Sequence, residues 1–304
     1  MQVADREVLA VSFTRPMEEV IVITARRSPV VRRRRLGIEL RRLREAAGLT
    51  IDQVADALEC SNSKISRIET GQVRATPRDV RDILELYQVA ADQRDALIQI
   101  AREAREKAWW QAYGNVPDVA YVGFEAAAAS ILTYEALLVP GLLQTEDYAR
   151  AIMRAARPDV PLDEIERRVE LRMARQALLT SNDSPVLWAV LDEGVLRRQV
   201  HSQRTTRDQL HRLIEAAGRP NVTLQVLPFI AGEHGGMAGG AFTILGFPDA
   251  NDPDVVYLEH IPRDLYLENP EEVKQYSIVF DELRAIALSP DDSRRFLMAL
   301  AQEL

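Results

Sequence analysis

The sequence holds one cysteine, Cys60, and only three lysines among its 38 basic residues. A single cysteine excludes an intramolecular disulfide and any zinc site built from several cysteines, and it is typical of a reducing compartment. No window approaches the roughly 20 uncharged apolar residues that a membrane helix needs. His201, His211, His234 and His260 show no close metal-ligand spacing, so no metal is expected. These absences predict a soluble cytoplasmic protein that does not enter a membrane.

The charge is unevenly distributed along the chain. The net charge is -8, yet residues 26–78 hold 13 arginines and lysines against 6 acidic residues. The phosphate backbone of DNA attracts positive charge, so this segment is a candidate for nucleic-acid binding. A chain of 304 residues exceeds the about 100 to 200 usual for one domain. We expect an N-terminal arm over residues 1–31, a basic domain over 32–108 and an acidic domain over 109–304.

The basic segment has the pattern of a helix, a turn and a second helix. Apolar residues recur at helical spacing from Leu36, and Gly48 supplies a residue that tolerates a left-handed helix end. Thr50 and Gln53 form the pattern of a capping box, in which each side chain bonds the other residue's backbone N–H. The second helix is therefore predicted to begin at Ile51.

A third helix follows a tight bend at Cys60. Ser61 is a favoured N-cap, and Ile65 and Ile68 form the apolar face. The residues left on the outer face all donate hydrogen bonds, and they are Asn62, Ser63, Lys64, Ser66 and Arg67. Such side chains suit a helix inserted into a major groove, although three helices packed for stability alone would show the same periodicity.

Leu36 to Gly71 resembles the Cro-like repressors, also called the Xre family, in its Gly48-Leu49-Thr50 entry, Val54-Ala55 pair, Ile65-Ser66 pair and closing Glu69-x-Gly71. The resemblance implies that Asn62, Ser63 and Arg67 read bases. It implies an internal ion pair between Arg44 and Glu69. The positions that it places near DNA phosphates are Arg41, Arg42, Thr50, Ser61, Lys64 and Ser66.

Two positions depart from the family pattern, and a run of arginines precedes the first predicted helix. Glu59 replaces the usual turn glycine, which costs stability because only glycine adopts a positive φ freely, and Ile51 replaces a glutamine that contacts phosphate. The run Arg32, Arg33, Arg34 and Arg35 is predicted to be an arm that follows phosphates or the minor groove. The alternative for this run is a solvated basic face.

The region beyond Trp110 mixes both kinds of secondary structure. Helical patterns lie at residues 124–130, 144–157, 162–179 and 205–217, and two capped helices begin near Pro270 and Pro290. Strand-like runs lie at 185–191, 221–227, 241–245 and 255–259. The predicted fold class is a mainly α, lambda-repressor-like helix-turn-helix bundle followed by an α+β domain with a small sheet.

The segments 139–150, 172–176 and 287–290 are similar to the C-terminal domain, of unknown function, of actinobacterial helix-turn-helix regulators. That group includes WhiJ-like and antitoxin-like proteins. The resemblance implies a regulator that is often paired with a small partner protein encoded nearby.

Enzyme chemistry is not expected, and no cofactor is. The glycine-rich segment 234–240 lacks the lysine and serine or threonine that end a Walker loop, and a hairpin or lid fits it better than nucleotide binding does. A self-cleaving repressor needs a serine and a lysine with a lowered pKa, and the C-terminal region offers only Lys274.

The sequence therefore predicts a dimeric regulator that binds a double-stranded operator and whose C-terminal domain senses a small-molecule effector or a partner. The alternative is an antitoxin-like protein that sequesters a small partner and autoregulates through its helix-turn-helix.

Overall fold

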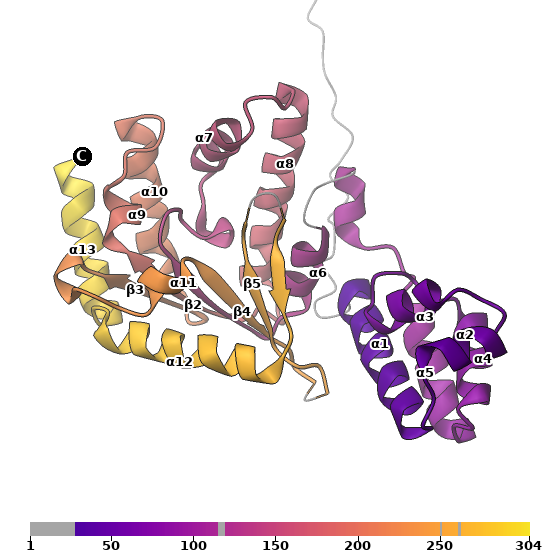
Figure 1. Ribbon diagram of the computed structural model, residues 1–304. Helices are drawn as coiled ribbons and strands as arrows, with labels where there is room; N and C mark the ends of the chain where they lie inside the picture. The colour runs from indigo at the N-terminus through magenta and orange to yellow at the C-terminus, as the bar shows by residue number, and fades with distance from the viewer. Residues whose placement is uncertain (1–27, 115–118, 250, 261–262) are drawn as a thin grey trace, which may run out of the picture.

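The computed structural model describes residues 28–114, 119–249, 251–260 and 263–304, so the predictions for residues 1–27 lie outside it. In this part of the chain, α-helices come first (Figure 1). They are α1 (Pro29–Ala46), α2 (Ile51–Ala57), α3 (Asn62–Glu69), α4 (Pro77–Leu86) and α5 (Ala91–Glu103). A short 3-10 helix, η1 (Trp109–Tyr113), leads towards the rest of the chain.

A mixed sheet organises the C-terminal region. Its strands are β1 (Ser130–Glu135), β2 (Val186–Asp192), β3 (Val222–Leu227), β4 (Phe242–Gly246), β5 (Val255–Leu258) and β6 (Leu265–Leu267). The six strands lie in the order β3-β2-β1-β4-β5-β6. β1, β2 and β3 are parallel to one another, and β4, β5 and β6 continue the sheet in antiparallel pairs.

Helices connect and cover the strands. The α-helices are α6 (Val119–Ala127), α7 (Glu146–Ala156), α8 (Leu162–Arg175), α9 (Glu193–Arg197), α10 (Gln203–Ala216), α11 (Gly236–Gly239), α12 (Pro270–Ile286) and α13 (Pro290–Glu303). The 3-10 helices are η2 (Gly141–Leu143), η3 (Gln176–Thr180) and η4 (Phe229–Ala231). Alternate side chains of a strand point to opposite faces, so the sheet needs cover on both.

Figure 1 shows α12 lying along one face of the sheet. Phe280 and Leu283 of α12 are fully buried there against Tyr134 and other strand residues. On the opposite face, α6, α8, α10 and α13 contribute residues such as Leu171, Leu213 and Leu297 to a larger core. The C-terminal region is therefore three layers, with unequal helical cover on the two faces.

Helix α1 is shared between two hydrophobic cores. Leu36 and Leu40 belong to the core of the N-terminal helices, whereas Val30 and Val31 belong to the core of the C-terminal region. At Gly123 of α6, a Cβ would lie 2.4 Å from Cγ2 of Val30, so glycine is what lets α6 pack this closely on α1. The first turn of α1 is thus built into the C-terminal region.

The predicted fold class is confirmed: an N-terminal helix-turn-helix bundle precedes an α+β region. The prediction of the first helix was wrong at its start, because Ser28 caps a helix that begins at Pro29 rather than near Leu36. Residues 28–31, assigned to the arm, are therefore the cap and first turn of α1. The strands β1 and β6 and the short helix α9 were not predicted. No helix in the described ranges is long and apolar enough to span a membrane.

Candidate DNA-binding surface

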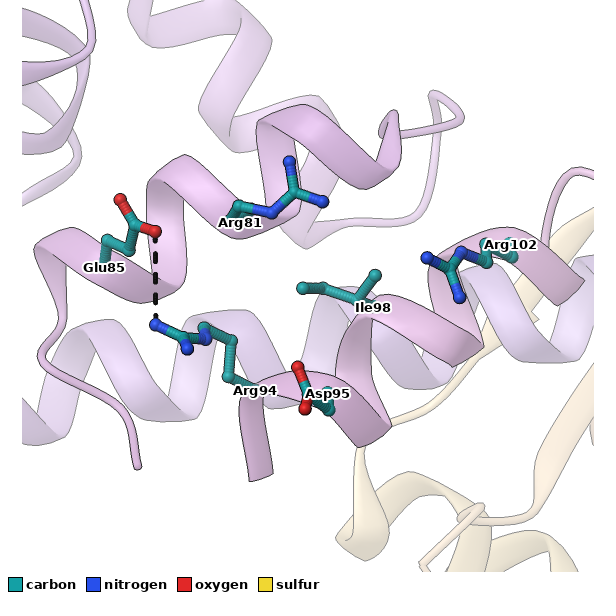
Figure 2. A pocket seen from close by; sticks show the side chains of 6 residues that line it. All are labelled: Arg81, Glu85, Arg94, Asp95, Ile98 and Arg102. Atoms are coloured by element: carbon teal, nitrogen blue, oxygen red, sulfur yellow. Dashed lines mark ion pairs between the residues drawn. The ribbon is translucent and has the colours of Figure 1, made fainter. Parts of the chain in front are cut away.

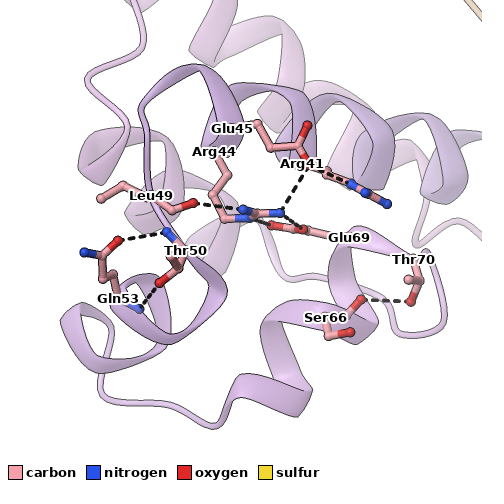
Figure 3. A network of polar contacts seen from close by, with 9 residues as sticks. All are labelled: Arg41, Arg44, Glu45, Leu49, Thr50, Gln53, Ser66, Glu69 and Thr70. Carbon is pink, nitrogen blue, oxygen red and sulfur yellow. Dashed lines mark hydrogen bonds and ion pairs between the residues drawn. The ribbon is translucent and has the colours of Figure 1, made fainter.

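Helices α2 and α3 each begin at an N-cap residue that the sequence predicts. Thr50 Oγ1 accepts a hydrogen bond from the Gln53 backbone N–H at 3.2 Å, and Gln53 Oε1 accepts one from the Thr50 N–H at 2.8 Å (Figure 3). Ser61 Oγ accepts from the Lys64 N–H at 3.2 Å and opens α3. Both cap hydroxyls keep their own hydrogen free to donate to an external acceptor.

The turn between α2 and α3 is strained at Glu59. Its φ is +49°, in the left-handed region that side chains disfavour. The Cys60 N–H nevertheless donates to the Ala55 carbonyl at 2.9 Å and closes the helix end. Glutamate at the usual glycine position therefore keeps the turn geometry at a conformational cost.

Helix α3 buries one face and exposes the other. Ile65 and Ile68 are 2% and 3% exposed, whereas Asn62, Ser63 and Arg67 lie in solvent. Among the described residues, Ser63 and Arg67 have no side-chain partner. Asn62 donates its amide to Asp52 of α2, which leaves its carbonyl oxygen available. The three residues predicted to read bases are thus together on one exposed surface.

The residues predicted to lie near phosphates are placed unequally. Lys64 Nζ donates to Asp79 Oδ1 of α4 at 2.7 Å, a bond that raises the pKa of Lys64. Ser66 is partly buried, while Thr50 and Ser61 are exposed caps at the starts of α2 and α3. Lys64 is therefore held in an ion pair that DNA would have to compete with or share.

Arg44 and Glu69 join α1 to the end of α3. The Arg44 Nε and Nη2 atoms donate to the two Glu69 oxygens at 2.7 and 3.0 Å, and Nη1 donates to the Leu49 carbonyl at 2.9 Å (Figure 3). The hydrogen bond to Glu69 raises the pKa of Arg44. At the same crossing, a Cβ on Gly37 would lie 2.5 Å from the Glu69 carbonyl oxygen. This contact fixes the tilt of α3.

The arginine run is not an arm that precedes the first helix. Arg32, Arg33, Arg34 and Arg35 lie within α1, and α1 crosses the C-terminal end of α3, away from Asn62. Arg34 is only 6% exposed, so it cannot reach a phosphate. Arg32 lies 3.2 Å from Glu103 of α5. The prediction of an arm was wrong because the acidic residues that bind Arg34 and Arg35 lie more than 200 positions away in the sequence.

Those acidic residues belong to the C-terminal region. Arg34 Nε lies 2.8 Å from Glu268 Oε2, and Arg34 Nη1 donates to the Pro253 carbonyl at 2.7 Å. Arg35 donates to Asp249. The pKa of the Asp249 carboxyl is lowered first by the hydrogen bond from the Asn251 backbone N–H and then by the hydrogen bond from Arg35. We call this group the α1 clamp: Arg34, Arg35, Asp249, Pro253 and Glu268.

Arg33 is the arginine of the run without an ion pair in the described ranges. Burial lowers its pKa, and the nearby positive charge of Arg74 lowers it further. Arg74 is exposed in the loop after α3, and the sequence analysis did not single it out. Its position, a few residues after a predicted recognition helix, was the sequence signal that could have identified Arg74 as a candidate DNA contact. On the other side of α1, Arg41 and Arg42 are exposed but bonded to Glu45 and Glu39.

An open hollow of about 440 Å³ lies between α4 and α5. Figure 2 shows its lining, which is Arg81, Glu85, Arg94, Asp95, Ile98 and Arg102. Charges of both signs alternate around it, and Arg94 is paired with Glu85 at 4.0 Å. A phosphate backbone is matched by a surface of one sign, so this hollow is a poorer candidate than the exposed face of α3.

Two family models match the chain. The first is a helix-turn-helix domain over residues 35–97, and the second is the domain of unknown function DUF5753 over residues 119–299, which is more than half of the chain. No curated protein and no solved structure matches the chain.

Proposed function

The chain belongs to the family of proteins that contain the DUF5753 domain, and we propose that it is a sequence-specific DNA-binding transcription regulator. The observation that carries the proposal is the exposed face of α3. Its side chains can donate hydrogen bonds, and Ser63 and Arg67 have no partner in the described ranges. The face belongs to the segment that matches the helix-turn-helix family model. Arginine and asparagine read guanine and adenine by paired hydrogen bonds in the major groove.

The backbone contacts that we propose surround this face. The cap hydroxyls of Thr50 and Ser61 can donate to phosphates, and the exposed Arg41, Arg42 and Arg74 bring positive charge. Lys64 and Ser66 complete this set in our proposal. We further propose a dimer, because one α3 reads a single half-site and operators pair two half-sites about one helical turn apart.

We also propose that the C-terminal region senses an effector or a partner and that α1 carries the signal. Val30 and Val31 pack in the core of the C-terminal region, while Arg44 of the same helix holds α3 through Glu69. A shift of the C-terminal region therefore has a rigid path to the tilt of α3. We also propose that the chain belongs to the WhiJ-like and antitoxin-like group of regulators, which it resembles.

Arg67→Ala is expected to relax sequence preference. The intact protein selects sites from fragmented genomic DNA, and affinities for the best site and for a scrambled one are then compared among variants. If Arg67 reads a base, Arg67→Ala should cost about 1 to 3 kcal/mol at the best site and little at the scrambled one. Arg41→Ala should weaken both DNAs alike and reduce the salt slope by about 0.9.

Arg204→Ala, at an arginine that is 90% exposed on α10, is the control and should change neither affinity. Unchanged affinity and preference in a folded Arg67→Ala protein would place the recognition surface elsewhere. Copurification of a small protein with the chain, without any enriched DNA site, would favour the antitoxin-like alternative.

Arg34→Met should loosen the first turn of α1. The variant keeps the apolar stem but loses the ion pair with Glu268 and the hydrogen bond to the Pro253 carbonyl, and a charged hydrogen bond contributes about 1.5 to 3 kcal/mol. Amide hydrogen exchange over residues 30–36 should accelerate by about tenfold or more. Arg42→Met, an exposed site on the same helix, should leave exchange there unchanged. Equal exchange rates over residues 30–36 in Arg34→Met and Arg42→Met would show that the α1 clamp does not hold the first turn of α1, and would contradict its place in the proposed path.

A further inference from the structure

A polar cluster lies at the carboxyl end of β1, on the face of the sheet covered by α8. Glu135 is the last residue of β1, and Thr133 and Thr243 lie behind it in register. Arg172 of α8 and Glu259, just after β5, are near enough for their charges to act on Glu135. Open sheets with parallel strands bind ligands at the carboxyl ends of those strands.

The loop that follows β1 is held rigid at this place. Gln144, 2% exposed, donates from Nε2 to the Val139 carbonyl at 2.7 Å, and its backbone carbonyl accepts from Gln176 at 2.6 Å. Gln209 of α10 accepts from the Thr145 N–H at 2.7 Å and donates to the Leu143 carbonyl at 2.8 Å. Such supporting bonds are what keeps a binding site in one geometry.

Arg172 is aimed by this loop but is not neutralised. Its Nη1 donates to Gln144 Oε1 at 2.8 Å, and its Nε is buried with no hydrogen-bond partner. Among the described residues it forms no ion pair. One helical turn away, Arg175 donates to both oxygens of Glu125 at 2.7 Å, so that carboxylate is already occupied.

The two carboxyl groups nearest in charge to Arg172, those of Glu135 and Glu259, form no ion pair among the described residues. Glu135 accepts a single hydrogen bond, from Thr133 Oγ1 at 3.2 Å, and burial raises its pKa to about 8. Glu259 is exposed and has no described ion-pair partner. Glu135 and Arg172 are each partly buried. Arg172 and Glu259 thus carry opposite charges near one another without forming an ion pair among the described residues, and leaving the partly buried charge of Arg172 unpaired is costly.

We propose that this cluster binds a small zwitterion of the amino-acid class, with its carboxylate on Arg172 and its ammonium on the carboxylate of Glu259, beside Glu135. Guanidinium groups bind carboxylates through charge-assisted hydrogen bonds, and the Nη2 of Arg172, which has no hydrogen-bond partner among the described residues, is the donor available for one. Each charged group of such a ligand is then matched by a protein group of opposite charge. The inference rests on the proposed function only in taking this ligand as the effector.

A contact route leads from the cluster to the DNA-binding helices. Arg172 and Arg175 share α8, and Arg175 is bonded to Glu125 of α6. Two residues earlier, Gly123 of α6 packs on Val30 of α1. A ligand that shifts Arg172 therefore acts on α8, α6 and α1 in succession.

The test is calorimetric titration of the full chain with each common amino acid, together with the thermal midpoint in its presence. We expect at least one amino acid to bind. Its decarboxylated amine and its α-hydroxy acid should each bind about tenfold more weakly or worse, since each lacks one charge. Arg172→Gln and Glu259→Gln should lose binding to a similar extent. Arg167→Gln, at an exposed site on the same helix, should bind as the parent does.

Absence of binding by every amino acid would overturn the proposal, and so would unchanged binding in Glu259→Gln, an exposed site whose substitution should not disturb folding. If the decarboxylated amine bound as tightly as the amino acid, the proposal that the ligand is a zwitterion would be wrong. The genomic selection on the same preparation separates the two proposals. Selected DNA without amino-acid binding defeats this inference alone, whereas amino-acid binding without selected DNA defeats the proposed function alone.

Discussion

Arg175→Met is expected to lower the free energy of unfolding by about 3 to 5 kcal/mol. Glu125 is 1% exposed, and both of its oxygens are held by Arg175 at 2.7 Å. The Arg175 guanidinium also lies over the Tyr121 ring, 5.2 Å from its centroid. Removing the cation leaves a buried carboxylate without a counter-charge, which is more costly than losing the pair altogether. Urea unfolding followed by circular dichroism measures the change.

Two further variants separate this cause from a general sensitivity of α8. Arg167→Met removes a pair with Asp163 at 3.2 Å on the solvent side of the same helix and should cost at most about 0.5 kcal/mol. The double variant Glu125→Leu with Arg175→Met should recover much of the loss, because neither charge is then buried. An Arg175→Met protein as stable as Arg167→Met would show that Glu125 is not isolated from water.

The helix-turn-helix was readable because its signals are local. Thr50 with Gln53, and Ser61 with the Lys64 N–H, lie within three residues of each other, and the structure forms both caps. The periodicity of Ile65 and Ile68 likewise reports directly which side of α3 is buried. Caps and helical spacing act over a single turn, so a sequence reader can evaluate them without knowing the fold.

The arginine run shows where such reading stops. A cluster of like charges indicates neither a partner nor a place, and the partners of Arg34 and Arg35 lie at positions 249 to 268. The strand β1 was missed for a related reason. Its sequence SILTYE follows four alanines at the end of a helical run, and its place in the centre of the sheet comes from pairing with β2 and β4. Strand preference depends on such context.

The polar cluster at β1 was visible only in part. The segments 139–150 and 172–176 stood out as a resemblance, which placed Gln144 and Arg172 in motifs without giving either a task. Glu135 and Glu259 carried no signal, because a glutamate at a strand end is ordinary in sequence. Their meaning depends on the sheet, in which only β4 separates β1 from β5, and on the absence of an ion pair to Arg172 among the described residues.

Arg44→Met is expected to cost about 3 to 5 kcal/mol and to abolish operator binding, because it strands Glu69 at the crossing of α1 and α3. Glu69 is 7% exposed and receives two bonds from Arg44, whose third bond to Leu49 fixes the turn before α2. Arg41→Met, whose pair with Glu45 lies in solvent, should cost at most about 0.5 kcal/mol. Unfolding is followed by hydrogen exchange resolved along the chain.

Because Arg44 acts on the core of the N-terminal helices, exchange should accelerate in α2 and α3 before it does in β1, β2 and β3, whose cluster is separate. Arg175→Met should show the reverse order. Acceleration of both regions together in each variant would mean that the two cores unfold as one cooperative unit, which would contradict the local effect assigned to each ion pair. Arg41→Met removes one proposed phosphate contact and should weaken operator binding without abolishing it. A loss equal to that in Arg44→Met would contradict the assignment of the Arg44→Met effect to a displaced α3.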